Sequence, residues 1–472
     1  MPRSWLIVPL LLLYLLHLGG VGFLGPDEPR YASIGRQMAQ SHDFVTPRLD
    51  GEPWFEKPPL LYWMVAAGHA LRLSDEWAAR LPVALASVAF LLFFCGAVER
   101  QFSSRVALLA TSILATSVGW LAYSSTALTD LPMSAALGAA VFITLFDTRP
   151  MAHLGNRGWI AGALLGLAIL GKGLVPLVLF APLLLIARGK RVGIIAGAIL
   201  VATPWHDLCY MRNGSLFWND YFWKQHVSRF FTPELQHVQP FWYYVPVLLA
   251  GFFPWTPLAG LLARRRLYED TRVLILAGWS AYGLLFFSVA RNKLPGYVLP
   301  LMPALAVVLA VAWDKAPLKE WWLTACALCL VALPTAASVL PDALNSGLSR
   351  AHFAVSYGGL VFLLAAGAAW WLAGREQREL AVLTVALAAA LGITYFKYAV
   401  YPVLDRDVSV RAFWNANKDK LNGVCMGDLA RASEYGLNYY AGRKLQPCSD
   451  ATAARLTGKG GRLQITQTGT SR

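Results

Sequence analysis

The sequence is poor in charged residues and in cysteines, and it has no repeated or low-complexity segment. Charged side chains make up 14% of the 472 residues and hydrophobic ones 57%, whereas soluble domains carry about 25% charged residues. This composition excludes a soluble enzyme and a disordered chain. Six cysteines are too few for a disulfide scaffold of this length. The remaining class is an integral membrane protein built of helices.

Acidic residues are scarcer than basic ones, with 27 Asp and Glu against 41 Lys and Arg. In a soluble protein the net charge of +14 would suggest a nucleic-acid partner. In a membrane protein it is explained by Lys and Arg retained in cytoplasmic loops, so we expect no nucleic acid. Apolar runs of about 15–22 residues, enough to cross a bilayer, predict thirteen spans near 5–24, 78–98, 104–124, 130–147, 157–171, 173–188, 191–210, 241–262, 272–290, 296–313, 320–340, 353–373 and 380–400.

Basic side chains gather in alternate connections between these spans. With the N-terminus inside, every even-numbered connection is short and basic, which fits the positive-inside rule and places the C-terminal segment outside. We interpret the first run as an uncleaved span, because no clear A-x-A cleavage site follows it. The basic residues concerned are Arg100, Arg105, Arg149, Arg157, Arg188, Lys190, Arg191, Arg264, Arg265, Arg266, Lys315, Lys319, Arg375 and Arg378.

Three outer segments are too long to be simple connectors, and long ordered loops are usually functional. They are residues 25–77, 211–240 and 401–472. The last of them is less hydrophobic than the rest of the chain, so we predict a transmembrane domain over 1–400 and a small α/β domain on the outer surface over 401–472.

Local patterns within these outer segments predict further detail. In the first one, Arg30–Gln40 and Pro59–Leu71 are expected to be helices lying along the membrane interface. In the last one, Cys425 and Cys448 are expected to form a disulfide in an oxidising compartment.

Charged residues at the outer ends of the spans are candidates for chemistry. Cations in this position suit a lipid-linked phosphate, and carboxylates beside them suit a general base or the stabilisation of a sugar oxocarbenium ion. Structural explanations compete with this one, since Asp27 and Asp130 could cap helices. Lys172, Arg291 and Lys293 could extend to lipid headgroups. The cations are Arg30, Lys57, Lys172, Arg291 and Lys293, and the acids are Asp27, Glu56 and Asp130.

Ordered motifs along nearly the whole chain carry a resemblance. They are Asp27-Glu28-Pro29-Arg30-Tyr31-Ala32, Glu56-Lys57-Pro58-Pro59, Thr129-Asp130, Lys172-Gly173, His226-x-x-Arg229-Phe230, Pro240-Phe241-Trp242-Tyr243-Tyr244, Gly251-Phe252-Phe253-Pro254-Trp255 and Lys293-Leu294-Pro295-x-Tyr297. With these motifs the sequence resembles the membrane glycosyltransferases of GT-C fold in the protein O-mannosyltransferase superfamily. Within that superfamily it is most similar to the lipid A aminoarabinose (4-amino-4-deoxy-L-arabinose) transferases.

The resemblance implies a role for each matching residue. Asp27 would be the principal catalytic carboxylate, with Glu28 and Asp130 as further acids of the catalytic set. Lys57 would hold the carrier phosphate. The other residues expected to bind substrate or phosphate are Arg30, Tyr31, Lys172, Arg229, Arg291, Lys293 and Tyr297.

A metal site is a further expectation from the resemblance, because some relatives hold a divalent ion near the Glu-Lys-Pro-Pro segment. Glu56 and His226 would then be ligands of zinc, magnesium or manganese. The alternative for His226 is a packed residue that orients Arg229. Gln225 stands where the family usually has an acidic residue.

The implied activity is inverting transfer of a sugar from undecaprenyl phosphate to a lipid A phosphate at the periplasmic face of the bacterial inner membrane. The substrates would be membrane lipids, and no obligate protein partner is evident. One alternative is transfer of mannose or another hexose from a polyprenyl phosphate to a protein or glycan. A transporter or flippase for a lipid-linked sugar is a more distant alternative, because the charges cluster at span ends on one side and no repeat is visible. A non-catalytic paralogue is equally distant, because Asp27, Lys57 and Asp130 are all present.

Overall fold

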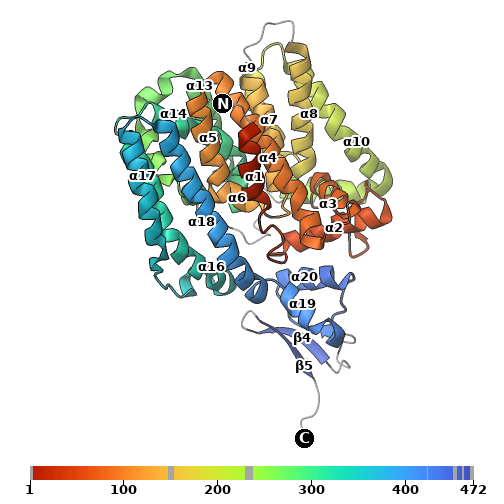
Figure 1. Ribbon diagram of the computed structural model, residues 1–472. Helices are drawn as coiled ribbons and strands as arrows, with labels where there is room; N and C mark the ends of the chain where they lie inside the picture. Colours follow the sequence, from red (N-terminus) through yellow and green to blue (C-terminus); the bar gives the residue numbers. More distant parts are fainter. Residues whose placement is uncertain are drawn as a thin grey trace.

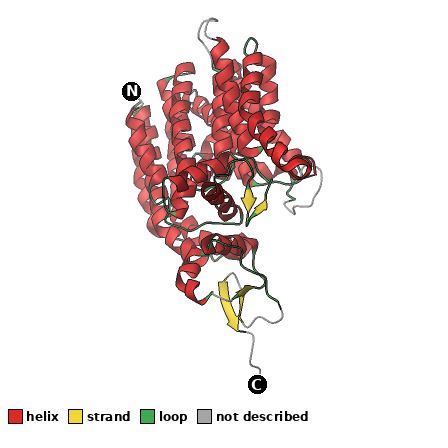
Figure 2. Ribbon diagram, turned by 90° about the vertical axis from the view of Figure 1, so that its right-hand side faces the viewer, coloured by secondary structure: helices red, strands yellow, loops and turns green. Residues whose placement is uncertain are grey.

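The computed structural model describes residues 4–146, 154–228, 238–421, 424–449, 454–459 and 462–467. These residues form a bundle of helices, and the short strands lie beside one end of that bundle and beyond it, toward the C-terminus (Figures 1 and 2). The helices of the bundle are α1 (Ser4–Leu15), α4 (Asp75–Gln101), α5 (Ser104–Thr116), α6 (Val118–Ser124), α7 (Asp130–Leu145), α8 (Leu154–Lys172), α9 (Val175–Ile186), α10 (Arg191–Phe217), α12 (Tyr244–Gly251), α13 (Thr271–Val289), α14 (Met302–Asp314), α15 (Lys319–Cys329), α16 (Leu333–Ser346), α17 (Phe362–Gly374) and α18 (Arg378–Asp407). Short irregular helices join them, including the π-helix η2 (Trp218–Ser228) and the 3-10 helices η4 (Thr256–Ala263), η5 (Arg265–Glu269) and η6 (Pro295–Leu301).

The helices have the length and composition of membrane spans. Within the described residues, seven helices are long and apolar enough to cross a membrane, or eight if the bent pair α5 and α6 counts as one span. Five further apolar helices are shorter. Each of the thirteen predicted apolar runs contains a helical segment. The prediction of a helical, multi-span membrane protein is therefore confirmed.

The predicted span over 104–124 is broken rather than straight. Its two halves, α5 and α6, meet at an angle of 60° at Ser117. A break in a helix leaves backbone N–H and C=O groups without their helical hydrogen bonds. Inside a membrane these groups need partners from the protein, because hydrocarbon cannot form hydrogen bonds. Here the Val118 N–H donates to the Phe253 carbonyl at 3.1 Å. The Trp255 indole donates to the Thr116 hydroxyl at 2.9 Å. The break is thus stabilised by residues about 140 positions further along the chain.

The first predicted span, 5–24, is helical only as far as Leu15. A lysine from α18 bonds the backbone carbonyls at the end of this helix. Lys397 Nζ donates to the carbonyls of Leu13 and Leu16 at 2.9 and 3.2 Å. A cation at a helix C-terminus also interacts favourably with the helix dipole. The chain then turns toward the first outer loop.

That first loop contains both of the helices predicted for it. They are α2 (Asp27–Ser41) and α3 (Leu60–Ala70), and between them β1 (Arg48–Leu49) pairs antiparallel with β2 (Glu52–Pro53). Seven of the fifteen α2 residues are buried, so one face of this outer-loop helix packs against the rest of the protein. This loop covers the end of the bundle that the C-terminal residues also approach (Figure 1).

The C-terminal residues form a small mixed structure beyond α18, which itself runs through residue 401 to Asp407. Its helices are α19 (Arg411–Asn417) and α20 (Arg431–Ala441). Its sheet has the order β3-β4-β5, in which β3 (Cys425–Met426) pairs parallel with β4 (Ala454–Lys459) and β5 (Arg462–Gln467) pairs antiparallel with β4. These elements share an apolar core of Val410, Leu421, Met426, Leu437, Leu445 and Leu456.

Candidate active site

Most of the predicted site residues meet in a cavity at the outer-loop end of the bundle. It is enclosed by the start of α2, the segment before α3, α6 with the segment that leads into the start of α7, the end of α8, and η6. Its volume is about 150 Å³. The lining residues are Asp27, Tyr31, Glu56, Lys57, Tyr123, Leu128, Thr129, Asp130, Lys172, Leu294, Pro295, Gly296 and Tyr297.

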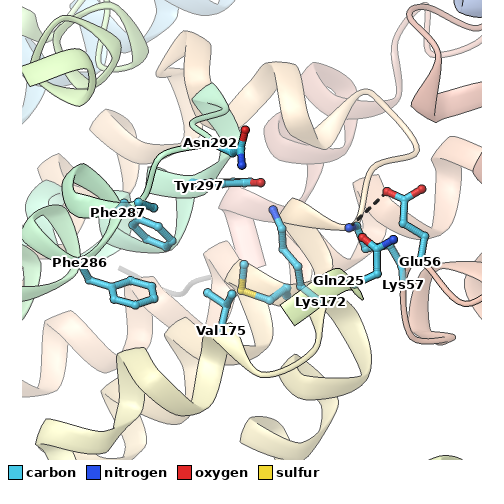
Figure 3. A pocket seen from close by; sticks show the side chains of 11 residues that line it. Glu56, Lys57, Lys172, Val175, Gln225, Phe286, Phe287, Asn292 and Tyr297 are labelled. Carbon is cyan, nitrogen blue, oxygen red and sulfur yellow. Dashed lines mark ion pairs between the residues drawn. The ribbon is translucent and has the colours of Figure 1, made fainter. Parts of the chain in front are cut away.

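A second cavity of about 120 Å³ shares four of these residues and has apolar walls. Figure 3 shows Lys172 between the rings of Phe286 and Phe287 on one side and the charged pair Glu56–Lys57 on the other. Val175 and Met133 complete the apolar wall. The combined space is therefore charged at one end and hydrocarbon-like at the other, which suits an amphipathic ligand.

Asp27 is placed by the first turn of α2. It follows Pro26, and a carboxylate in the first turn of a helix is favoured by the helix dipole. Its side chain is 43% exposed, and one oxygen accepts from Arg30 Nη2 at 2.5 Å, one helical turn away. Asp27 is thus held in position by Arg30 and still accessible from the cavity.

Arg30 connects Asp27 to the Glu56-Lys57 motif. Its Nη2 lies 3.0 Å from Glu56 Oε2, and Lys57 Nζ lies 3.4 Å from Glu56 Oε1. Burial opposes the charge of Arg30, but the nearby carboxylates of Glu56 and Asp27 raise its pKa above the ordinary value. Arg30 therefore stays charged and joins two segments about thirty residues apart into one ionic network.

The rings around Arg30 add a further constraint. The guanidinium carbon lies 5.3 Å from the ring centre of Tyr31, 5.6 Å from that of Trp54 and 5.5 Å from that of Tyr435. At these distances a cation is attracted to the faces of aromatic rings. Tyr435 belongs to α20, so the C-terminal residues reach the edge of the candidate site.

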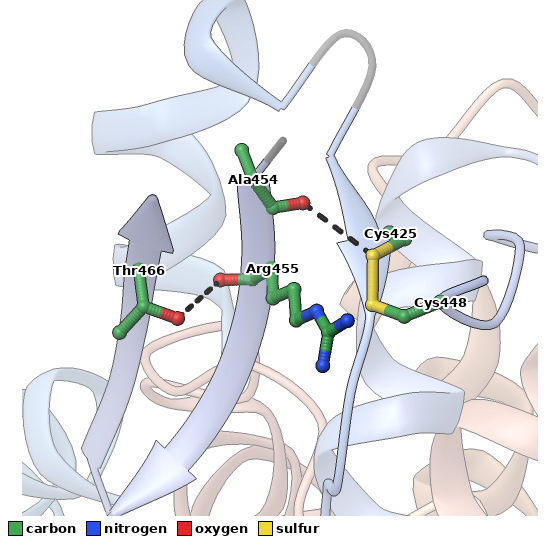
Figure 4. Close-up of a disulfide and its surroundings, with 5 residues drawn as sticks. All are labelled: Cys425, Cys448, Ala454, Arg455 and Thr466. Carbon is green, nitrogen blue, oxygen red and sulfur yellow. Dashed lines mark hydrogen bonds between the residues drawn. A yellow bond between two sulfur atoms is a disulfide. The ribbon is translucent and has the colours of Figure 1, made fainter. Parts of the chain in front are cut away.

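α20 is held against the first loop by other contacts as well. Arg36 of α2 donates to the Tyr439 carbonyl at 2.7 Å, and the Tyr439 hydroxyl donates to Asp75 at 2.8 Å. The predicted disulfide between Cys425 and Cys448 is present, with a Cα–Cα separation of 4.8 Å, and lies beside β4 (Figure 4). This confirms the pairing and links β3 to the segment after α20.

Asp130 and Lys172 form the second ionic pair of the site, at the start of α7 and the end of α8. Both ends follow the helix dipole rule, with the acid at an N-terminus and the cation at a C-terminus. The side chains are 15% and 10% exposed, and Lys172 Nζ lies 4.7 Å from the ring centre of Tyr297. Gly173 has a φ of +85°, so the turn after Lys172 requires a glycine.

Glu28 is separated from Asp27 although the two are adjacent in sequence. Its carboxylate is 1% exposed and accepts two bonds from Arg80 of α4, at 2.7 and 2.9 Å. It also accepts from the backbone N–H groups of Leu24 and Ala127, both at 2.9 Å. Arg80 in turn donates to the carbonyls of Leu18, Val21 and Gly22. This pair fixes the path of the chain into α2.

The structure places the remaining predicted cations differently. Arg291 is exposed. Lys293 is buried and donates to the carbonyls of Ala290 and Gln239 at 2.6 and 3.0 Å, and burial lowers its pKa. Arg229 lies outside the described residues, and so does the side chain of His226.

The expected metal site does not fit the donors that are described. Glu56 already pairs with Arg30 and Lys57, and two cations at a carboxylate disfavour a third. Among the described residues there is no group of three or more His, Cys, Asp or Glu side chains that could hold a metal ion. We therefore assign no step to a metal.

Several residues of the site were not predicted from the sequence. Tyr123 comes from the bent helix α6, and Gly296 leaves the space into which the Asp130 carboxylate and the Tyr123 hydroxyl project. Gly296 lies inside the motif Lys293-Leu294-Pro295-x-Tyr297 and could have been found there. Tyr435 and Arg80 carry no such signal, since their roles depend on contacts with distant segments.

Comparison with known proteins confirms the resemblance to this class of glycosyltransferases. A family described as dolichyl-phosphate-mannose-protein mannosyltransferase matches residues 56–206. Undecaprenyl phosphate-alpha-4-amino-4-deoxy-L-arabinose arabinosyl transferases are similar in sequence. The one from Serratia proteamaculans is 34% identical over 327 residues, which is 65% of this chain and 59% of the relative. The one from Pectobacterium carotovorum is 35% identical over 335 residues, which is 65% of this chain and 58% of the relative. The chain thus matches these curated relatives over less than two thirds of their length.

A solved structure shows the same fold over nearly the whole chain. The crystal structure of ArnT from Cupriavidus metallidurans bound to undecaprenyl phosphate superposes with a TM-score of 0.78 at 24% identity. The match covers 96% of this chain and 87% of that protein. The chain therefore shares its fold with ArnT over the helical bundle and the outer loops.

Proposed function

We propose that this chain is an inverting glycosyltransferase that moves 4-amino-4-deoxy-L-arabinose from undecaprenyl phosphate to a phosphate of lipid A. The observation that carries the proposal is the cavity, in which an accessible carboxylate, Asp27, and two cations, Lys57 and Lys172, adjoin an apolar space. The names of the sequence relatives support the choice of donor and sugar.

The donor would enter with its phosphate toward the lysines and its hydrocarbon tail along the apolar wall. As the bond between the anomeric carbon and the phosphate oxygen breaks, negative charge accumulates on the departing phosphate. Cations already in place stabilise that charge without reorganisation, which is usually the largest catalytic contribution. We assign this role to Lys57 and Lys172, which Glu56 and Asp130 hold in position. Tyr31 and Tyr297 line the same space.

Asp27 would act on the opposite side of the sugar. An oxygen of the acceptor forms the new bond to the anomeric carbon from the face away from the phosphate, which gives inversion. A lipid A phosphate is already anionic, so Asp27 would position it or stabilise the sugar cation. With a hydroxyl acceptor Asp27 would take the proton, and general-base help of this kind is worth about 10²–10⁴ in rate. We assign Glu28 a structural role, because Arg80 and two backbone groups saturate it.

The proposal extends to topology and location. Thirteen spans, a periplasmic cavity and a separate α/β domain over 401–472 would place the reaction at the outer face of the bacterial inner membrane. The substrates are lipids, and no protein or nucleic acid partner is required. Transfer of a hexose to a protein or glycan by the same machinery is the second candidate, favoured by the family match over residues 56–206.

Mass spectrometry of lipid A tests the proposal. A strain lacking its aminoarabinose transferase would be compared with the same strain expressing this chain, its Asp27→Asn variant or its Glu52→Gln variant. Glu52 is an exposed acid of the same loop and serves as the matched control. We expect one added aminoarabinose on a lipid A phosphate with the unchanged chain and with Glu52→Gln, but none with Asp27→Asn. Unmodified lipid A in every strain, with each protein expressed, would move the acceptor to a protein or glycan.

A further inference from the structure

The segment between α1 and α2 leads directly to Asp27 and forms no helix or strand. This connector comprises residues 16–26, and Asp27 is the first residue of α2. Buried backbone N–H and C=O groups need hydrogen-bond partners, and a connector without secondary structure must find them in other parts of the chain. Arg80 and Glu28 supply some of these partners, to Leu18, Val21, Gly22 and Leu24.

Side chains of α18, α19 and α20 bond to the middle of the connector. α18 ends beside α19 and α20, and α20 lies next to α2 (Figure 1). The Gly22 N–H donates to Asp405 Oδ1 at 2.7 Å, Arg411 Nη1 donates to the Gly19 carbonyl at 3.0 Å, and the Phe23 N–H donates to the Tyr440 hydroxyl at 3.3 Å. These partners lie between 383 and 417 residues away along the chain. The C-terminal part of the chain therefore holds the path into α2.

Arg411 joins these bonds into one network. Its Nε lies 2.9 Å from Asp405 Oδ1, and its Nη1 lies 3.3 Å from Glu76 Oε1 in the first turn of α4. The Tyr440 hydroxyl donates to the same Glu76 oxygen at 2.7 Å. The Arg411 side chain is 20% exposed, and partly buried ion pairs are screened less than exposed ones. One cation thus links α4, α18 and α20 around the connector.

Gly22 shows how closely the connector approaches this network. A Cβ at this position would lie 2.7 Å from Arg411 Cβ and 2.9 Å from the Tyr440 hydroxyl. Both distances are shorter than the optimal separation of non-bonded carbon atoms, about 3.5–4.0 Å. The connector backbone therefore packs directly on Arg411 and Tyr440, so that a change in the network moves the connector.

We propose that Arg411 is a positioning residue for sugar transfer, an inference that rests on the function proposed above. With Asp405 and Tyr440 it fixes the connector just before Asp27. Asp27 acts on the acceptor side of the sugar, whereas Lys57 and Lys172, which hold the donor phosphate, belong to other segments. Loss of Arg411 therefore impairs the transfer step and leaves donor binding unchanged.

Steady-state kinetics of the purified full-length protein test this role. Arg411→Met would be compared with the unchanged chain and with Arg406→Met. Arg406 is the matched control, because it pairs with Asp407 near the end of α18 and its side chain is 71% exposed. A displacement of about 1 Å can cost about 10²-fold in rate, so we expect kcat to fall at least about tenfold in Arg411→Met with the donor KM within about twofold. Arg406→Met should change neither. Equal losses in both variants, or a higher donor KM at unchanged kcat, would overturn the proposal.

Hydrogen–deuterium exchange of the same proteins reports on the connector independently of activity. We expect the amides of Gly22 and Phe23 to exchange about tenfold faster in Arg411→Met, because charge-assisted contacts are lost, at an unchanged unfolding midpoint. Unchanged exchange would exclude the positioning role even if kcat falls. If the unchanged chain transfers no sugar, the proposed function fails, and exchange alone decides whether Arg411 holds the connector. If Arg411→Met does not fold, Tyr440→Phe, which removes only the hydroxyl, must lower kcat and speed the same exchange.

Discussion

Gly296 controls the room around the Asp130 carboxylate. A Cβ at this position would lie 2.5 Å from Asp130 Oδ1 and 2.7 Å from the Tyr123 hydroxyl, too close for either to stay in place. Displacing a side chain of a catalytic site by about 1 Å can reduce a rate about 10²-fold. We therefore expect Gly296→Ala to lower sugar transfer by about that factor while the thermal unfolding midpoint changes little.

Gly278 supplies the control for this substitution. It lies in α13, and a Cβ there would meet nothing within 4 Å. Gly278→Ala should leave transfer unchanged and stabilise the helix slightly. The comparison requires a transfer assay with purified donor and a melting curve for each variant. Equal activity of Gly296→Ala and Gly278→Ala would show that sugar transfer does not require the open space next to Asp130.

Glu28 and Asp27 should respond differently to loss of charge. Glu28→Gln leaves Arg80 buried without a counter-charge, and breaking one side of a buried ion pair costs about 3–5 kcal/mol. Asp27→Asn changes a side chain that is 43% exposed, where such pairs contribute about 1 kcal/mol or less. We expect Glu28→Gln to lower the stability measured by thermal or denaturant unfolding far more than Asp27→Asn. A stable but inactive Glu28→Gln would instead place Glu28 in the chemistry.

The sequence could not distinguish these two acids, although its motifs located both. They are neighbours in one motif at the outer end of a span, and the physical argument from charge and position applies to each equally. On a helix, consecutive residues point about 100° apart, so one faces the cavity and the other faces α4. Which one faces the cavity depends on Arg80, about fifty residues away, and no local pattern contains that contact.

At the scale of elements, the length of the apolar runs in the sequence predicted where helices lie but not where each helix ends. The thirteen runs contain helices because about 20 apolar residues in a membrane have few alternatives to helical structure. The break between α5 and α6 depends on Phe253 and Trp255 in a distant segment. The early end of α1 is stabilised by Lys397. Such terminations depend on tertiary partners, which hydropathy along the chain does not show.

The contact between α20 and α2 predicts that the C-terminal segment influences catalysis. Tyr435 is a positioning residue, since it touches Arg30 and not the cavity. One cation–ring contact is worth about 0.5–2 kcal/mol. We expect Tyr435→Ala to lower kcat/KM for the donor about three- to tenfold.

Tyr435→Phe is the matched substitution, because it keeps the ring and removes only the hydroxyl. It should retain nearly full kcat/KM for the donor. The same loss in both variants would show that the hydroxyl acts instead of the ring, and no loss in either would remove Tyr435 from the positioning of Arg30.

For the whole molecule, the distribution of charge predicts which side of the membrane the cavity faces. α13 carries the chain from the basic segment at Arg264, Arg265 and Arg266 to the cavity, over about 28 Å for its nineteen residues. Basic residues are retained on the cytoplasmic side. The cavity, with Asp27 and the first loop, should then face the periplasm, where a lipid A acceptor could reach it.

Labelling of single introduced cysteines with a membrane-impermeant maleimide checks this orientation in spheroplasts. Cys95, Cys209 and Cys326 are buried and Cys425 is bonded to Cys448, whereas Cys329 at the end of α15 is partly exposed. Background labelling should therefore be low once Cys329 is replaced by serine. We expect Glu52→Cys, in the exposed hairpin of the first loop, to react in intact spheroplasts, and Arg265→Cys to react only after lysis. The reverse pattern would place the cavity on the cytoplasmic side. An acceptor at the outer face would then be excluded, even though the fold and the arrangement of the site would be unchanged.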